Sequence, residues 1–150
     1  MRLLALLAAG LFAGSLLADD KKPKDEDAII GKWKVVKMEH GKKQEPTDEE
    51  VAKLEMVFTF GKFGQAIQSS VTKEGKTDQK AEFEIDPSGK PKTIVLTQGN
   101  ARMFGIYELS GDTLKMCVAS GKPALPTELK AVEGEAMMMT LKRQKEEKNK

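Results

Sequence analysis

The sequence predicts an all-β protein: an eight-stranded antiparallel up-and-down barrel with at most one short helix. From residue 29 onward, short runs of alternating apolar and polar residues are separated by Gly, Pro, Asp and Ser, the usual pattern of strands and turns. The connections are nearly all short, as antiparallel neighbours allow. A Gly-x-Trp at Gly31 and Trp33, with Arg143 near the other end of the domain, supplies an apolar ring and a cation that would together shut one end of a barrel. Closure is preferred over the alternatives, an open sheet or a two-layer sandwich, because it removes exposed sheet edges.

Eight runs carry the strand pattern. In the clearest of them, residues 53–60, the side chains of Leu54, Met56, Phe58 and Phe60 are expected on one face, because successive side chains of a strand alternate between faces. In chain order the predicted strands span 31–39, 53–60, 65–72, 79–86, 93–97, 103–109, 113–118 and 136–143.

The single predicted helix is a short turn at 46–51. Thr47 and Glu50 have the spacing of a capping box there, and the acidic residues of this segment suit the positive end of a helix dipole. Gly111 and Asp112 predict a short hairpin connection, whereas 119–135 is expected to be a longer loop.

The first 18 residues have the layout of a secretory signal. Arg2 supplies a positive charge, an apolar run of about 15 residues follows, and Ala18 precedes an acidic pair. The run is shorter than the roughly 20 residues that span a bilayer, which predicts a cleaved signal without a stable membrane anchor. We therefore expect an extracytoplasmic protein, periplasmic or secreted. Residues 19–28 are expected to form a flexible polar leader, 29–143 the barrel domain, and 144–150 a charged disordered tail.

The charge balance and the cysteine content narrow the function further. With 25 Lys and Arg against 23 Asp and Glu, the chain has no basic excess of the kind that binds nucleic acid or an anionic membrane. Cys117 is the only cysteine, so no internal disulfide is possible. Its strand context predicts a small buried apolar residue.

Five segments together point to one family: those at 31–36, 86–92, 105–109, 111–114 and 126–128. Through them the chain, from about Ile29 to Lys145, resembles the lipocalin-like domain family found in many copies in planctomycete bacteria, a family of uncharacterised function. The resemblance implies a lipocalin-like barrel behind an export signal. True lipocalins are less similar, because only Gly31, Trp33 and Arg143 carry over and the Thr-Asp-Tyr-like turn of their middle motif is absent.

The ionisable side chains do not predict an enzyme. His40 is the only histidine and lies at a strand-to-loop exit, where it has no predicted partner for acid–base or nucleophilic chemistry. The sequence has neither a Gly-x-Ser-x-Gly elbow nor a His and Cys spacing typical of metal sites. We expect no catalytic residue, no metal and no cofactor.

The apolar residues instead predict a binding module that takes up a small apolar ligand inside the barrel. The ligand site is expected at the end opposite Trp33, because Gly31, Trp33 and Arg143 occupy the other end. Arg143 rather than Lys142 is expected against Trp33, because alternation places Arg143 on the same side of the strand as Leu141. Residues whose size and softness would let a cavity adapt are Met56, Phe58, Phe83, Tyr107, Met116 and Met139.

The alternative is a structural or protein-interaction domain of the cell envelope, whose partner the sequence does not identify. An eight-stranded barrel is only just wide enough to be filled by its side chains or to hold one small ligand. In the last strand, Met137 and Met139 are expected to be core residues and Met138 to be partly exposed.

Overall fold

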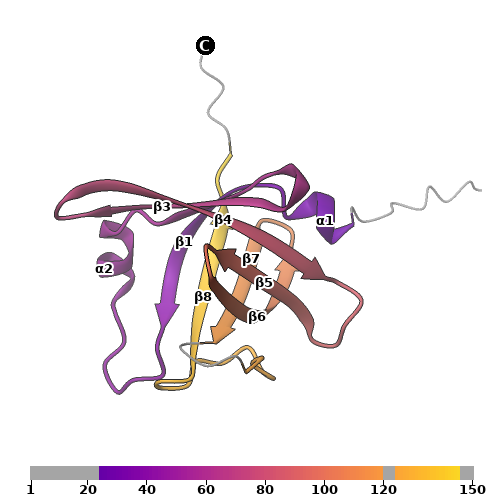
Figure 1. The fold of residues 1–150 in the computed structure, drawn as a ribbon. Coiled ribbons are helices and arrows are strands. Elements are labelled where there is room, and N and C mark those ends of the chain that lie inside the picture. The colour runs from indigo at the N-terminus through magenta and orange to yellow at the C-terminus, as the bar shows by residue number, and fades with distance from the viewer. Residues whose placement is uncertain (1–23, 120–123, 146–150) are drawn as a thin grey trace, which may run out of the picture.

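The computed structural model describes residues 24–119 and 124–145, in which eight strands form a closed barrel (Figure 1). Sequence neighbours pair antiparallel in order, and β8 pairs back onto β1. The predicted eight-stranded antiparallel up-and-down barrel is therefore confirmed. The strands are β1 (Gly31–Glu39), β2 (Val57–Phe60), β3 (Gln65–Thr72), β4 (Gly75–Asp86), β5 (Lys92–Gln98), β6 (Ala101–Ser110), β7 (Thr113–Ala119) and β8 (Ala136–Arg143).

The largest difference from the predicted strands is at β2, which begins at Val57 rather than at residue 53. The preceding residues belong to helix α2 (Asp48–Lys53), which starts with the predicted capping box between Thr47 and Glu50. Leu54 is the C-cap of this helix and is 38% exposed, so its predicted place on the inner face of a strand is wrong. The helix continues to Lys53 because its capped first turn and the buried Val51 hold it, and both outweigh the alternation that follows.

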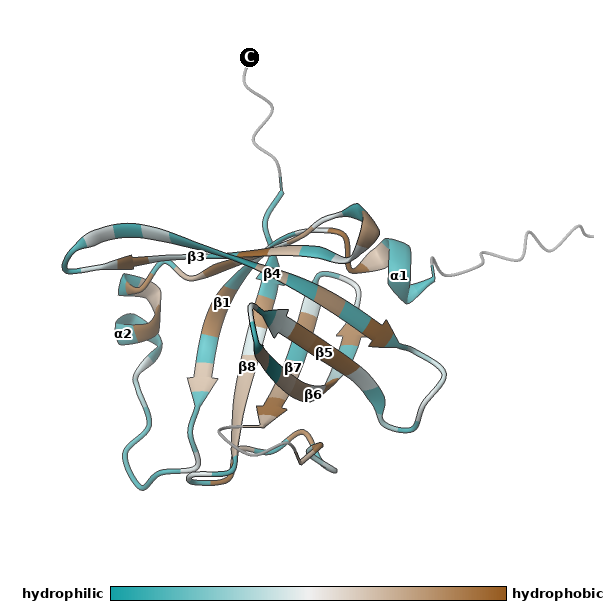
Figure 2. Ribbon diagram, in the orientation of Figure 1, coloured by the Kyte–Doolittle hydropathy of each residue, from teal (hydrophilic) through white to brown (hydrophobic). Residues whose placement is uncertain are grey.

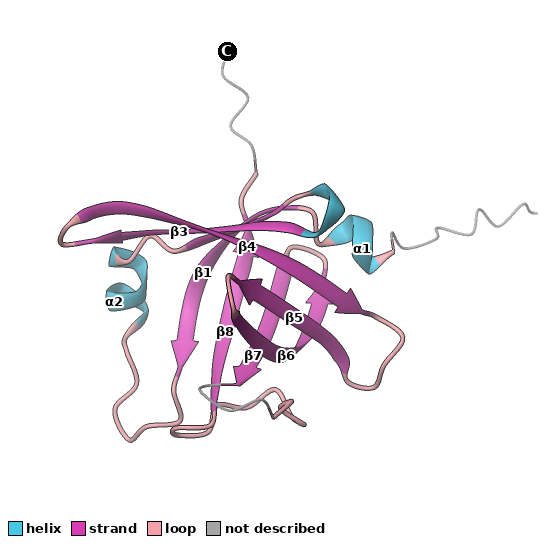
Figure 3. Ribbon diagram, in the orientation of Figure 1, coloured by secondary structure: helices cyan, strands magenta, loops and turns pink. Residues whose placement is uncertain are grey.

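Two short elements add to the one helix expected (Figure 3). Helix α1 (Asp25–Ala28) takes up residues assigned to the flexible leader, and the 3-10 turn η1 (Lys62–Gly64) connects β2 to β3. Four residues are too few for a helix to be stable by itself. The acidic first turn of α1 suits the helix dipole, and side-chain contacts of Asp25 with the barrel, described below, hold the helix in place.

The main core fills the barrel interior. Hydrophilic and hydrophobic residues alternate along the strands (Figure 2), which places one side chain in two inside the barrel. The largest fully buried side chains of this core are Trp33, Phe60, Ile29, Ile94, Leu114, Met116 and Leu141.

A second, smaller core lies on the outer face of the barrel wall. Ile106, Cys117 and Met138 are neighbours on β6, β7 and β8, and Leu129 and Ala131 from the loop before β8 pack against them. Met138 is consequently only 6% exposed, and the expectation that it is partly exposed is wrong. Periodicity assigns a residue to a face of the sheet, but it does not reveal that a loop covers the outer face. Cys117 is buried here, and burial raises the pKa of its thiol.

The strand registers define two different ends of the barrel. At the closed end, Gly31 pairs with Phe60 and Trp33 with Arg143. At the other end, which we call the mouth, Met38 pairs with Met139. Residues 75–81 of β4 precede its pairing with β5 and pair with β3 alone, so the β3–β4 hairpin projects past the neighbouring strands (Figure 1).

Candidate functional site

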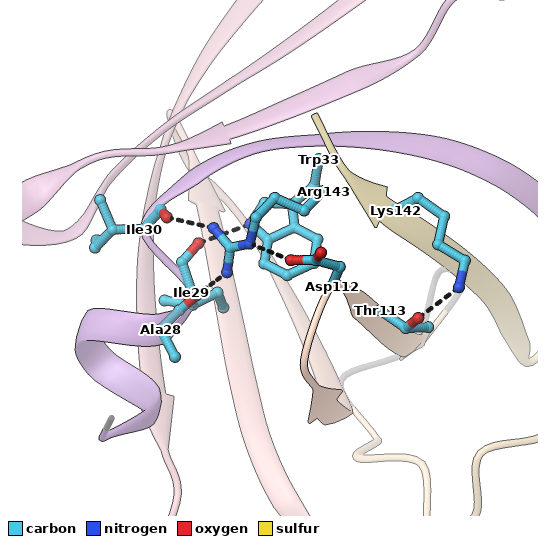
Figure 4. Close-up of polar contacts among 8 residues, drawn as sticks. All are labelled: Ala28, Ile29, Ile30, Trp33, Asp112, Thr113, Lys142 and Arg143. Carbon is cyan, nitrogen blue, oxygen red and sulfur yellow. Dashed lines mark hydrogen bonds and ion pairs between the residues drawn. The ribbon is translucent and has the colours of Figure 1, made fainter. Parts of the chain in front are cut away.

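Trp33 fills the closed end of the barrel (Figure 4). Its side chain is fully buried, and its indole Nε1 donates a hydrogen bond to the carbonyl oxygen of Ile29 at 2.8 Å. The guanidinium of Arg143 lies over the ring, with Cζ 4.1 Å from the ring centre. A cation at this distance from an indole face is attracted by the ring quadrupole.

Arg143 also ties together the segments that meet at the closed end. It donates hydrogen bonds to the carbonyl oxygens of Ile30, at 2.9 Å, and of Ala28, and its Nε lies 3.3 Å from a carboxylate oxygen of Asp112 (Figure 4). Lys142 faces the other way and donates to the Thr113 hydroxyl. The closed end is thus sealed by an apolar ring and a cation whose three nitrogens each contact an oxygen.

Gly31 permits the close approach of this arginine. Its φ of +130° is a conformation that L side chains rarely adopt, and a Cβ atom there would lie 3.0 Å from Nη1 of Arg143. The three residues predicted to shut the barrel, Gly31, Trp33 and Arg143, therefore lie close together at its closed end.

A polar cluster attaches α1 to the same end. The carboxylate of Asp25 accepts hydrogen bonds from Lys92 Nζ at 2.7 Å and from the Tyr107 hydroxyl at 2.8 Å. Burial by itself raises the pKa of Asp25, but these hydrogen bonds and the Lys92 charge outweigh it, so the pKa lies below its ordinary value. Burial, together with the hydrogen bond to Asp25, raises the pKa of Tyr107, which therefore stays a donor. The cluster fixes Tyr107 at the closed end rather than at a ligand site.

We expect the Asp25 contacts to stabilise the fold at neutral pH and not in acid. Because the folded pKa is depressed, the contribution is present above the unfolded value of about 3.9 and is lost as the pH falls through the folded pKa. Asp25→Asn should lower the free energy of unfolding by about 1 kcal/mol at pH 7, and this difference should shrink toward zero near pH 2. Urea unfolding of both proteins across this range measures it. Asp27→Asn, an exposed position of the same helix, is the control, and an Asp25→Asn difference that did not change with pH would contradict the prediction.

The mouth of the barrel holds an apolar pocket of about 100 Å³. Residues of all eight strands, together with Met56 just before β2, line the pocket. It is therefore the barrel lumen and not a surface groove. The lining consists of Met38, Met56, Phe58, Ala66, Gln68, Gln79, Ala81, Leu96, Gln98, Met103, Val118, Met137 and Met139.

Five of the eight methionines of the chain line this pocket. Methionine side chains are unbranched and polarisable, and they fill irregular spaces by changing rotamer. The volume is below the ~150 Å³ of an engineered protein cavity that binds benzene. A ligand of that size therefore fits only if methionines move aside or if part of it remains at the mouth.

The pocket contains half of the residues predicted to bind a ligand. Met56, Phe58 and Met139 line it, at the end opposite Trp33. Phe83, Tyr107 and Met116 point inward but lie elsewhere: Phe83 packs edge-on against Phe60, with ring centres 4.9 Å apart, Tyr107 binds Asp25, and Met116 is fully buried. Alternation indicates which side chains point inward, but not how deep along the barrel each one lies.

The polar side chains of this site are not among the residues predicted from the sequence. Gln68 and Gln79 are direct cross-strand partners on β3 and β4, and Gln98 ends β5. Gln79 lies two residues before Ala81, which also lines the pocket, so alternation would have placed it on the inner face. A prediction based on apolar residues alone does not include this glutamine.

Two further features, a metal site and a membrane-spanning helix, can be assessed within the residues that the structure describes. Within residues 24–119 and 124–145, no group of three or more His, Cys, Asp or Glu side chains is arranged to hold a metal ion. No helix in these two ranges is long and apolar enough to cross a membrane.

A protein-family model described as a lipocalin-like domain matches residues 29–116, from just before β1 into β7. No curated protein and no solved structure matches the chain.

Proposed function

Because the chain belongs to the lipocalin-like domain family, we propose that it is an exported, non-enzymatic domain that binds a small apolar ligand in the mouth of its barrel. As part of the same proposal we place it with the planctomycete members of the family, because its segments 111–114 and 126–128 resemble theirs. The observation that carries the proposal is the methionine-lined pocket, which is the open part of the lumen of a barrel closed at its other end.

The non-enzymatic part of the proposal rests on the chemistry of the pocket lining. No ionisable side chain is among the residues that line the pocket in the described structure. His40, the only histidine of the chain, follows the end of β1 and is not part of the lining. General acid–base chemistry needs such a group within hydrogen-bond reach of the reacting atoms.

The export part of the proposal rests on residues 1–18, which lie outside the described residues. Their order of positive charge, apolar run and small residues supports a cleaved signal. N-terminal sequencing of the protein from its own host should give a first residue between Gly14 and Asp20. An intact Met1 on cytosolic protein would contradict export.

Binding is best tested with naphthalene, an uncharged apolar probe, on protein carrying ¹³C-labelled methionine methyl groups. We expect saturable chemical-shift changes for the methyls of the lining methionines, such as Met38 and Met137, and none for Met138, which faces the outer wall. Ala81→Trp fills the pocket and should abolish these changes, because an indole there exceeds the available volume. Ala52→Trp, the same substitution at an exposed site on α2, should leave them unchanged.

A second candidate, a protein-interaction domain with a filled barrel, is favoured by two observations. The pocket is smaller than the roughly 300 Å³ at which small-molecule sites begin. In addition, Phe63 in η1 is 97% exposed and has a φ of +63°, a backbone conformation that is strained for a bulky residue. Such strain concentrates at functional sites. A titration in which no methionine methyl shifts, for the wild type as for Ala81→Trp, would favour this candidate.

A further inference from the structure

We propose that the ligand is an amphiphile with an uncharged polar end, such as an alcohol, ester, aldehyde or amide, and that three glutamines at the mouth select it. The proposal rests on the proposed function of the same pocket. Its basis is the composition of the lining, where the only polar side chains among the described residues are the amides of Gln68, Gln79 and Gln98.

The three amides lie on one side of the mouth. They come from the consecutive strands β3, β4 and β5, and Gln68 and Gln79 face each other across the β3–β4 pair. Met137 and Met139 of β8 line the pocket as well. The lining therefore offers a polar side for a head group and an apolar side for a chain.

The charged residues of β4 that lie next to the lining residues are directed to the outer face. Lys80 and Glu82 alternate with Gln79 and Ala81 on β4 and are exposed. On β6 the guanidinium of Arg102 lies over the ring of Phe104, 5.4 Å from its centre, on the face opposite to the lining residue Met103.

At the mouth end of β1 the charged side chains are likewise directed away from the lumen. Lys37 and Glu39 form an ion pair at 3.2 Å, while Met38 between them lines the pocket. Neither a cation nor an anion of the described chain thus belongs to the pocket wall, although charged side chains lie next to lining residues in the sequence.

A pocket with this lining discriminates by charge. A carboxylate or an ammonium group loses part of its hydration when it comes against the amide rim of this pocket, and no opposite charge among the described lining residues compensates it there. A hydroxyl or carbonyl group instead exchanges its hydrogen bonds with water for hydrogen bonds with amides, which both donate and accept.

These amides are available to a ligand. Among the described residues, their one side-chain hydrogen bond to protein runs from Gln68 Nε2 to the sulfur of Met56, at 3.9 Å, and sulfur is a weak acceptor. Gln79 is exposed and Gln68 is half-buried, so the amide groups form a rim that a head group reaches while its chain points into the lumen.

The test compares three ligands of one chain length at pH 7: 1-octanol, octanoate and octylammonium, followed by the methionine methyl shifts. We expect 1-octanol to bind at least about tenfold more tightly than either ion. Equal or tighter binding of octanoate or octylammonium would overturn the inference while leaving the proposed function intact, because an apolar ligand would still bind. If neither naphthalene nor any of the three shifts the methyls, the proposed function itself fails.

Substitution of one amide provides a second arm. Gln79→Lys puts a cation on the exposed rim and should raise the affinity for octanoate about tenfold without strengthening octylammonium binding. Glu82→Gln, an exposed outward position on the same strand, changes the net charge by the same amount and should leave all three affinities unchanged. If both variants raised octanoate binding equally, the overall charge rather than the rim would select the ligand, and the inference would be wrong.

Discussion

Replacing Trp33 by alanine will lower the free energy of unfolding by about 3–5 kcal/mol, the range found when a core aromatic residue is deleted. The side chain is fully buried at the closed end, so its removal leaves a cavity between β1 and its neighbours. The substitution also removes the indole donor to the Ile29 carbonyl and the face on which Arg143 lies.

Urea unfolding at pH 7 measures this effect, with two variants for comparison. Trp33→Phe retains an aromatic face but not the Nε1 donor, and should cost less than Trp33→Ala. Phe63→Ala truncates an aromatic residue that is almost fully exposed, and should change the stability by less than about 0.5 kcal/mol. An unchanged stability of Trp33→Ala would mean that the closed end does not depend on its ring.

Replacing Arg143 by methionine will lower the free energy of unfolding by about 2–4 kcal/mol. Methionine keeps an unbranched apolar chain beside the indole, so the loss comes mainly from the guanidinium. The carbonyl oxygens of Ala28 and Ile30 lose a charged donor, and Trp33 loses the cation over its ring.

The neighbouring residue supplies the control for this change. Lys142→Met removes a positive charge one position away, but Lys142 is exposed and contacts Thr113 instead of the closed end. It should cost less than about 1 kcal/mol. Similar losses for the two variants would show that net charge, and not the contacts of the guanidinium, stabilises the protein.

The fold could be predicted from the sequence because its strands obey a simple period. β1, β3 and β8 have the predicted bounds, and the Gly31–Trp33 and Arg143 pattern indicated which strands meet. The period failed where another element competed for the same residues, as at Leu54, which caps α2.

The candidate site was less predictable, for two physical reasons. Depth along the barrel depends on strand register, which set Phe83 and Tyr107 nearer the closed end than Met56 and Met139. Contacts between distant segments also escape periodicity: Asp25 belongs to an acidic stretch that reads as solvated chain, but Lys92 and Tyr107 attach it to the barrel.

The chain enters and leaves the barrel at the same end. β1 begins and β8 finishes beside Trp33, and α1 is attached there through Asp25 (Figure 1). A protein immobilised on a sensor surface at Lys24 or Lys145, the ends of the described chain, would therefore present its mouth to the solution, with the sealed end toward the support. The same geometry suits fusion of a reporter domain after Lys145, since that junction would not lie across the entrance for a ligand.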